Sequence, residues 1–184
     1  MGQGCVQKAM YSNVLKTLAL SACIATAPSL LAQAATDERI LEIEGRITDG
    51  EKKLAGCEVI VYEGNEVVGR QVTDKNGRFG LGLGLNKEFA LVFQKEGFLA
   101  KRVLVDTRAK IPAEMIGIPP LEMAMSMLPA SKYDGGDTDV LDFPFAIVRW
   151  NKQAMAFVQD QQYTAGMMRA NGAALLQAGR TTKD

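Results

Sequence analysis

The chain has 184 residues, of which 21 are basic and 21 acidic, so its formal net charge is zero. This balance argues against a nucleic-acid-binding protein, whose affinity comes mainly from clustered basic side chains. A hydrophobic content of 47% is ordinary for a globular protein and too high for a disordered one. The sequence contains no histidine, which excludes Ser-His-Asp triads, Cys-His pairs and histidine-ligated zinc. Composition therefore disfavours most hydrolases.

Residues 1–34 have the layout of a secretory signal peptide. Two lysines are the only charged residues before Asp37, an apolar run covers residues 18–27, and residues 32–34 read Ala-Gln-Ala, the small-residue exit that signal peptidase accepts. The apolar run is too short for a membrane-spanning helix. We therefore expect an exported protein that is cleaved after Ala34.

Two alternatives remain open in this segment. Residues 20–23 (Leu-Ser-Ala-Cys) resemble a bacterial lipobox, which would make Cys23 the lipidated first residue of the mature protein. Against lipidation, the apolar stretch before Cys23 is very short and apolar sequence continues past it. Met10 is an alternative start, because the segment from Met10 onward has the usual proportions of a signal. Cleavage after Ala34 leaves Cys57 as the single cysteine, so the mature chain forms no intramolecular disulfide.

Residues 40–128 alternate between apolar and polar positions, with turn signals at intervals of about eight to twelve residues. The expected strands cover residues 40–47, 57–62, 67–73, 79–85, 89–93, 98–105 and 121–128. In the second strand, Cys57, Val59 and Val61 share one face. Seven short strands without crossover helices predict an all-β fold, and a two-sheet sandwich is the simplest arrangement.

Four segments of this region follow one another as in a known family. They are Gly45-x-Ile47, Leu54-x-Gly56-Cys57-x-Val59-x-Val61-Tyr62, Thr73-Asp74-x-Asn76-Gly77-x-Phe79-x-Leu81 and Phe89-x-Leu91-x-Phe93-x-Lys95-x-Gly97-Phe98. The series resembles the carboxypeptidase regulatory-like domain, a transthyretin-like (prealbumin-like) β-sandwich of exported bacterial proteins, over residues 40–105. Cys57 departs from the small residue usual in the family, and a buried thiol would fit there. The resemblance implies a fold and a compartment, the periplasm or the outer membrane, more than an activity.

The resemblance does not bring a catalytic activity with it. Relatives with zinc or hydrolase chemistry use histidine, which this chain lacks, so their activities do not carry over. We therefore expect a non-catalytic cell-envelope module without a cofactor, whose partner is an envelope or outer-membrane protein. A glycan-binding module of the carbohydrate-binding-like fold is the alternative. No nucleic acid is expected as a partner, and no transmembrane helix is expected in the mature chain.

The C-terminal part, residues 131–184, is expected to form a separate element after a signal peptide (1–34) and a sandwich (35–130). A polar linker leads to a β-hairpin with strands at residues 145–150 and 155–158. Asp160 is the expected N-cap of a helix. One broad face of this helix is formed by Tyr163, Met167, Ala170, Ala174 and Ala178. The pattern is similar to tails that follow this sandwich in Bacteroidetes envelope proteins.

Two groups of residues suggest metal ligands. Asp134, Asp137, Asp139 and Asp142 offer oxygen ligands for Ca²⁺, but their order does not match an EF-hand loop, and a solvated linker is the favoured interpretation. Thioethers of Met123, Met125 and Met127 fall on one strand face, as Cu(I) would require. Alternating apolar residues are more typical of a core. We therefore predict no metal.

Two further groups suggest docking. Gly80, Gly82 and Gly84 form a bare strand face that could receive a sugar ring, or, as we favour, the protein's own C-terminal helix. Trp150 and Tyr163 could stack on a sugar, and packing of the C-terminal element onto the sandwich is favoured. Since no set of residues supplies nucleophile, base and orienting group, we predict that the chain is not an enzyme.

Overall fold

The computed structural model describes residues 39–133 and 143–181, all within the unit Thr36–Asp184. The predicted signal peptide, including Cys23, lies outside the described residues. Within the described ranges, no helix has both the length and the apolar character needed to cross a membrane.

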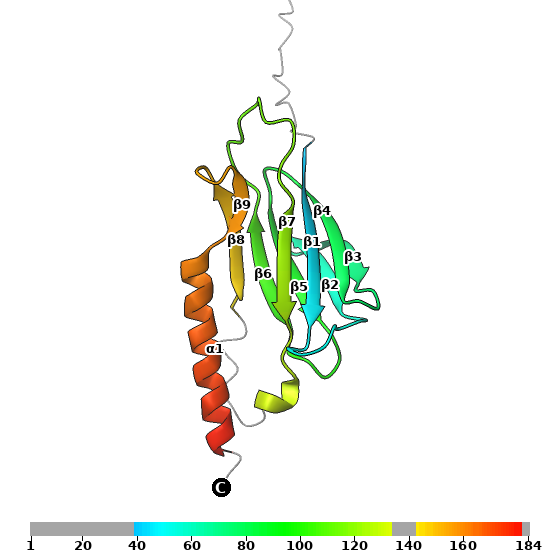
Figure 1. The fold of residues 1–184 in the computed structure, drawn as a ribbon, viewed down its shortest axis with the longest axis vertical. Coiled ribbons are helices and arrows are strands. Elements are labelled where there is room, and N and C mark those ends of the chain that lie inside the picture. The colour runs from blue at the N-terminus through cyan, green and yellow to red at the C-terminus, as the bar shows by residue number, and fades with distance from the viewer. Residues whose placement is uncertain (1–38, 134–142, 182–184) are drawn as a thin grey trace, which may run out of the picture. The chain divides into compact units, whose positions relative to one another are not determined.

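Nine β-strands and one long helix follow one another in the described part of the chain (Figure 1). The strands are β1 (Ile40–Thr48), β2 (Glu58–Glu63), β3 (Glu66–Val72), β4 (Arg78–Gly84), β5 (Glu88–Gln94), β6 (Lys101–Asp106), β7 (Leu121–Ser126), β8 (Ala146–Asn151) and β9 (Ala156–Gln159). The short 3-10 helix η1 covers Ala130–Tyr133 and the α-helix α1 covers Gln161–Thr181. Two sheets result, with strand orders β4-β1-β7 and β3-β2-β5-β6-β8-β9.

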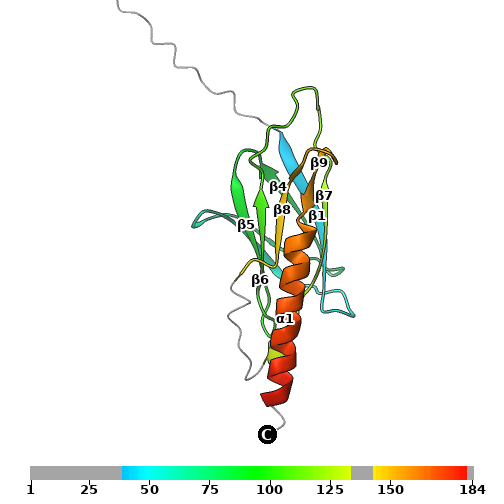
Figure 2. The same cartoon turned by 90° about the vertical axis from the view of Figure 1, so that its left-hand side faces the viewer.

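The predicted C-terminal hairpin is present, but it belongs to the sandwich, so the described sheets hold nine strands and not seven. Strand β8 pairs in parallel with β6, with Val103 opposite Ala146 and Val105 opposite Val148. Strand β9 then pairs antiparallel with β8 and forms the edge of the six-stranded sheet. Helix α1 follows β9 and extends beyond the strands at the lower end of the view (Figure 2). Alternation of apolar and polar residues identifies strands. It gives no information about which strand pairs with which, so it could not show that β8 pairs with β6.

The sixth predicted strand begins three residues later than expected, at Lys101. Gly97, with φ of 78°, ends the preceding turn. Phe98 then forms an isolated bridge with Pro129, and the Leu99 amide donates to the Leu128 carbonyl at 2.9 Å. These residues therefore pair with the segment after β7 before the chain enters β6.

The core between the sheets is apolar, as the alternation predicts. Its most deeply buried apolar side chains are Leu41, Ile43, Ile47, Cys57, Val59, Leu91, Phe93, Val103, Val105, Met127 and Val148. The Cys57 thiol is completely buried and donates to the Gln94 carbonyl at 3.5 Å, and burial raises its pKa. This agrees with the buried thiol expected at Cys57.

Gly45 and Phe79 are direct partners in the antiparallel pair of β1 and β4. The Phe79 ring occupies the space beside Gly45: a Cβ there would lie 2.2 Å from the ring and 2.9 Å from the Met123 carbonyl oxygen. The same ring meets Phe93 of the other sheet edge-on, with centroids 5.5 Å apart. Phe79 thus bridges the two sheets, and only glycine at position 45 leaves room for it.

The turn between β3 and β4 is held by its own side chains. The Asp74 carboxylate accepts from the Asn76 amide at 2.7 Å and from the Arg78 amide at 2.8 Å, and these bonds lower its pKa. Gly77 has φ of 70°, which suits the left-handed position of the turn. The buried Thr73 hydroxyl accepts from the Cys57 amide at 2.9 Å. The motif around this turn is therefore explained by backbone hydrogen bonding.

Gly45→Ala is expected to destabilise the protein by about 1–3 kcal/mol, because the added methyl group displaces the Phe79 ring from the core. Gly80→Ala is the matched control, since a Cβ there has only the Ile43 carbonyl oxygen nearby, at 3.9 Å. Urea unfolding of both variants measures the difference. Equal midpoints for the two variants would contradict the role given to Phe79.

Asp74→Ala is expected to lower the midpoint of thermal unfolding at neutral pH, because the variant leaves two turn amides without their acceptor. The pKa of Asp74 is lowered in the folded state, so its contribution is present above the ordinary value of 3.8 and is lost as the pH falls through the folded value. Calorimetry across this range should show the difference from the wild type disappearing in acid. Asp74→Asn, which keeps an acceptor oxygen, should lose less at pH 7.

Candidate interaction surfaces

The predicted metal ligands give no metal site in the described residues. Met125 and Met127 are buried and Met123 packs against the core, so all three face inward with the sandwich side chains. In the described ranges, no three acidic or cysteine side chains gather as metal ligands would. The four aspartates of the candidate Ca²⁺ loop, Asp134, Asp137, Asp139 and Asp142, lie outside the described residues.

The glycine face of β4 points outward, but the C-terminal helix does not cover it. Gly80 and Gly82 are exposed and Gly84 is half-buried. Helix α1 instead has its main contacts with η1 and β8. Ile40 of β1 is the neighbour that approaches, with its Cδ1 atom 3.4 Å from where a Cβ of Gly82 would lie. The expected docking of the helix is wrong because β8 joins the opposite sheet and carries the helix with it.

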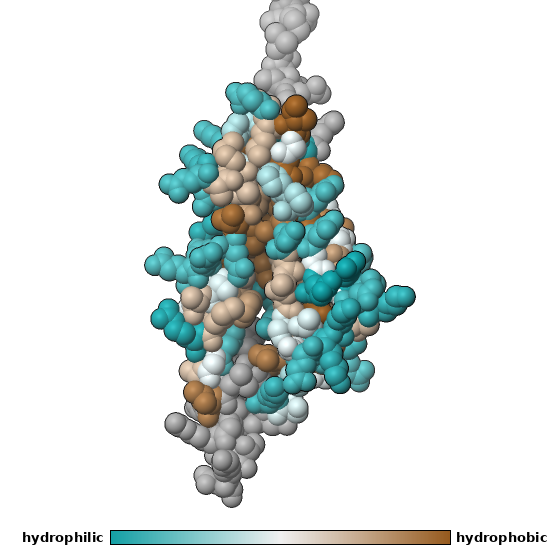
Figure 3. Space-filling view, viewed as in Figure 1, coloured by the Kyte–Doolittle hydropathy of each residue, from teal (hydrophilic) through white to brown (hydrophobic). Residues whose placement is uncertain are grey.

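Two charged rows cross this outer face, over β1 and β4 where Figure 3 shows hydrophilic residues. The acidic row consists of Glu122, Glu44 and Gly80, which are partners across β7, β1 and β4. The basic row, next along the strands, consists of Ala124, Arg46 and Arg78. All six residues are exposed, and they contribute to the lining of one open hollow. Sequence reasoning missed these rows, because they form only when β1 pairs with both β4 and β7.

The outer face of the six-stranded sheet carries a row of apolar residues. This apolar row consists of Val67, Tyr62, Ala90, Leu104 and Ile147, each the direct partner of the next across β3, β2, β5, β6 and β8. At about 4.8 Å per strand it is about 19 Å long. Val67 is exposed and the other four are half-buried. The sequence does show apolar residues at outward positions of these strands. Only the register between the strands shows that they form one row.

Edge strand β3 adds exposed apolar surface at one end of this row. Val67, Val68 and Val72 are 43%, 51% and 61% exposed. The register with β2 shifts by one residue between Val61 and Tyr62, which marks a β-bulge. Val68 is the extra residue of this bulge, while Val67 and Val72 stay in register with Tyr62 and Glu58.

Trp150 and Tyr163 hold the C-terminal element together. Trp150 packs against the core and meets Phe157, its partner on β9, edge-on at 5.2 Å. The Tyr163 hydroxyl donates to the Pro144 carbonyl at 2.7 Å. The Asp160 carboxylate accepts from the Tyr163 amide at 2.9 Å, so the predicted N-cap is confirmed.

The expected apolar face of α1 is present as far as its side chains are described. Tyr163, Met167 and Ala170 are half-buried and Ala174 is buried. Ala178 lies outside the described side chains. Thr164 is also buried, and its hydroxyl accepts from the side-chain amide of Gln159 at 2.8 Å. The apolar pattern of the helix gives no reason to expect this contact.

Lys101 is a basic residue that points inward between the sheets. Its ammonium group donates to the Ser126 carbonyl at 2.5 Å and lies 4.3 Å from the centre of the Phe145 ring. Burial lowers its pKa. The contact joins β6, β7 and the segment before β8, so this lysine has a structural role in attaching the C-terminal hairpin.

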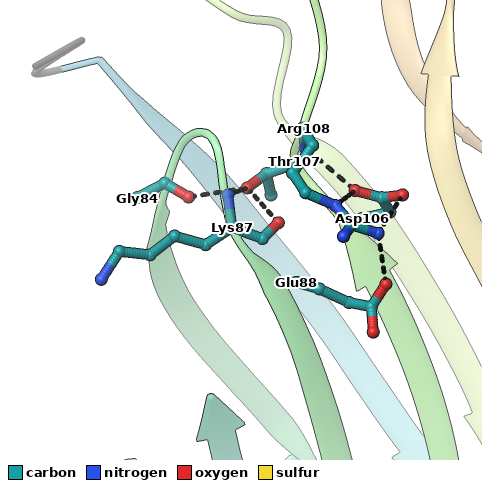
Figure 4. A network of polar contacts seen from close by, with 6 residues as sticks. All are labelled: Gly84, Lys87, Glu88, Asp106, Thr107 and Arg108. Atoms are coloured by element: carbon teal, nitrogen blue, oxygen red, sulfur yellow. Dashed lines mark hydrogen bonds and ion pairs between the residues drawn. The ribbon is translucent and has the colours of Figure 1, made fainter. Parts of the chain in front are cut away.

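A polar network ties the turn between β4 and β5 to the end of β6 (Figure 4). The buried Thr107 hydroxyl accepts from the Lys87 amide at 3.0 Å and lies 3.0 Å from the Gly84 carbonyl oxygen. Arg108 bonds both Glu88 and Asp106, and its guanidinium lowers the pKa of Asp106. Because these groups bond one another, the network has a structural role: it holds the turn between β4 and β5 to the end of β6.

A second open hollow lies beside the β8–β9 hairpin. Its lining consists of Arg149, Trp150, Asn151, Val158, Gln159, Asp160 and Gln161. It combines amide, carboxylate and guanidinium groups with an indole ring. The oxygen of Asn151 already accepts from the Gln153 and Ala154 amides, so its amide nitrogen is the group left for a ligand.

No protein-family model matches the chain, and no curated protein matches it. Solved structures with a similar strand arrangement include catechol 1,2-dioxygenase from Acinetobacter, with 12% identity and a TM-score of 0.39 over 61% of this chain and 59% of that one. A DUF3823 family protein from Parabacteroides merdae matches with 17% identity and a TM-score of 0.37, covering 50% and 48%. A pilus 2b backbone protein of group B streptococcus matches with 12% identity and a TM-score of 0.34, covering 51% and 43%. The chain spans less than two thirds of the length of each.

These matches correct the prediction that the chain is not an enzyme. Dioxygenases that act on catechol, chlorocatechol or hydroxyquinol recur among the matching structures. The prediction that the chain is not an enzyme therefore does not stand. With TM-scores of 0.34 to 0.39, the similarity concerns strand arrangement alone and assigns no reaction to this chain.

Proposed function

We propose that this chain is an exported module of the bacterial cell envelope that works by binding another protein, with β3 as its main contact strand. The observation that carries the proposal is the group of exposed valines on this edge strand, Val67, Val68 and Val72. An edge strand offers unpaired backbone groups together with these side chains, and an extended partner segment can use both.

The apolar row supports a partner larger than one strand. It begins at Val67 on the edge and continues inward over β2, β5, β6 and β8. A partner that adds to β3 can therefore extend apolar contacts over the outer face of the sheet. Aromatic and aliphatic side chains in such a position are the usual anchors of a protein interface.

The sequence features of the chain support the compartment. Residues 1–34 have the charge, apolar length and exit residues of a signal peptide. The series of motifs in residues 40–105 resembles the carboxypeptidase regulatory-like domain of exported bacterial proteins. The proposal places the mature chain in the periplasm or at the outer membrane.

A photo-reactive amino acid in place of Val68 is expected to cross-link an envelope protein when intact cells are irradiated, because this side chain points away from the core at the open edge. Lys75, an exposed residue of the turn between β3 and β4, is the matched control position. Fractionation followed by mass spectrometry identifies the products and their compartment. Products in the cytosol alone, or the same products from both positions, would contradict the proposal.

Glycan binding is a second candidate, and the hollow beside the β8–β9 hairpin is the observation that favours it. Trp150 contributes the aromatic surface there, and Arg149 and Asn151 contribute polar groups. Aromatic rings with polar neighbours suit the two faces of a sugar.

If the hollow binds a glycan, Arg149→Ala should weaken retention on the polysaccharide that the wild type binds by about tenfold or more, since hydrogen bonds to charged groups are the stronger ones. Affinity electrophoresis on a panel of polysaccharides measures retention. Arg102→Ala is the matched control, because Arg102 is exposed on the same sheet but does not line this hollow. Absence of retention on the whole panel would remove this candidate.

A further inference from the structure

The acidic and basic rows on the three-stranded sheet place like charges side by side. Glu44 of β1 and Glu122 of β7 are direct partners, and so are Arg46 of β1 and Arg78 of β4. Like charges on directly paired strand residues are unfavourable. Within the described residues, none of these four side chains forms an ion pair. Each pair would be stabilised by opposite charge placed above it.

The two rows are arranged so that the same face can supply that opposite charge. They are adjacent along the strands, because Glu44 and Arg46 are two residues apart and both point outward. A two-fold axis that runs across the strands between the rows lays the acidic row of one copy over the basic row of another. The operation is reciprocal, so Glu44 of each copy faces Arg46 of the other, as a closed two-fold interface requires.

The glycines of β4 leave room for this approach. The same axis places Arg78 of one copy over Gly80 of the other, where a Cβ would have no neighbour closer than 3.9 Å. The hollow in this face is lined only by residues of β1, β4 and β7, including the charged members of both rows. A long arginine side chain can therefore enter beside Glu44 without displacing the core.

We propose that the outer face of the β4-β1-β7 sheet binds a second copy of this chain in a two-fold symmetric dimer. Charge complementarity between the two rows identifies the partner. An unrelated protein would need its own acidic row and basic row at the same spacing to match them. The surface is separate from β3, so this proposal does not depend on the one above.

The dimer is reversible and sensitive to salt. Three strands at about 4.8 Å give a face about 14 Å wide, which buries less than the roughly 800 Å² per partner of a standard stable interface. Exposed ion pairs each contribute little, and salt screens them. Association is therefore expected at high protein concentration and low ionic strength.

Charge-reversal variants test the symmetry directly. The first variant, Glu44→Lys with Glu122→Lys, makes both rows basic and leaves Glu42, which lies beyond the acidic row, unchanged. The second, Arg46→Glu with Arg78→Glu, makes both rows acidic. Sedimentation equilibrium in 50 mM salt is expected to show each variant alone dimerising at least about tenfold more weakly than the wild type. An equimolar mixture should recover dimers that contain one copy of each, because an acidic face then meets a basic one.

Two controls keep the result specific. Glu96→Lys changes the net charge at an exposed turn outside both rows and should dimerise as the wild type does. Raising the salt to 500 mM should weaken the wild-type dimer by at least about tenfold. A wild type that stays monomeric at low salt, a dimer indifferent to the reversals, or a mixture that fails to associate would overturn the proposal. None of these outcomes bears on cross-linking from Val68.

Discussion

The contact between Phe79 and Gly45 is the constraint on which the sandwich depends. Phe79 belongs to the three-stranded sheet, and its ring reaches Phe93 in the six-stranded sheet. The ring can take this position only because its partner across β1 and β4 has no side chain. The spacing and packing of the two sheets therefore depend on one glycine at the centre of β1.

In the proposals above, binding takes place at the outer faces and edges of the sandwich. The two outer faces differ in chemistry. One carries the apolar row and ends at the exposed valines of β3. The other carries an acidic row and a basic row next to the glycines of β4. The apolar row is bordered by ion-paired residues such as Glu58 with Arg70 and Glu88 with Arg108, whereas the charged rows of the other face have no such partners among the described residues.

The sequence predicted much of the fold because alternation reports burial directly. Val59, Val61, Phe79 and Leu83 are buried where the pattern places them, and Leu81 packs against them half-buried. The N-cap at Asp160 followed from side-chain chemistry and the local sequence alone. Neither the partner of β8 nor the position of α1 could follow in this way, since strand pairing between distant segments leaves no local signal.

The amino-acid sequence by itself determined which segments become strands, which residues face inward and where the turns fall, since these depend on interactions within a few residues. It also excluded every mechanism that needs an imidazole. Only the tertiary structure decided that β7 pairs with β1 and β8 with β6. Those two pairings bring Glu122 beside Glu44 and Ile147 beside Leu104, because residues distant in sequence become neighbours only when strands are placed in register.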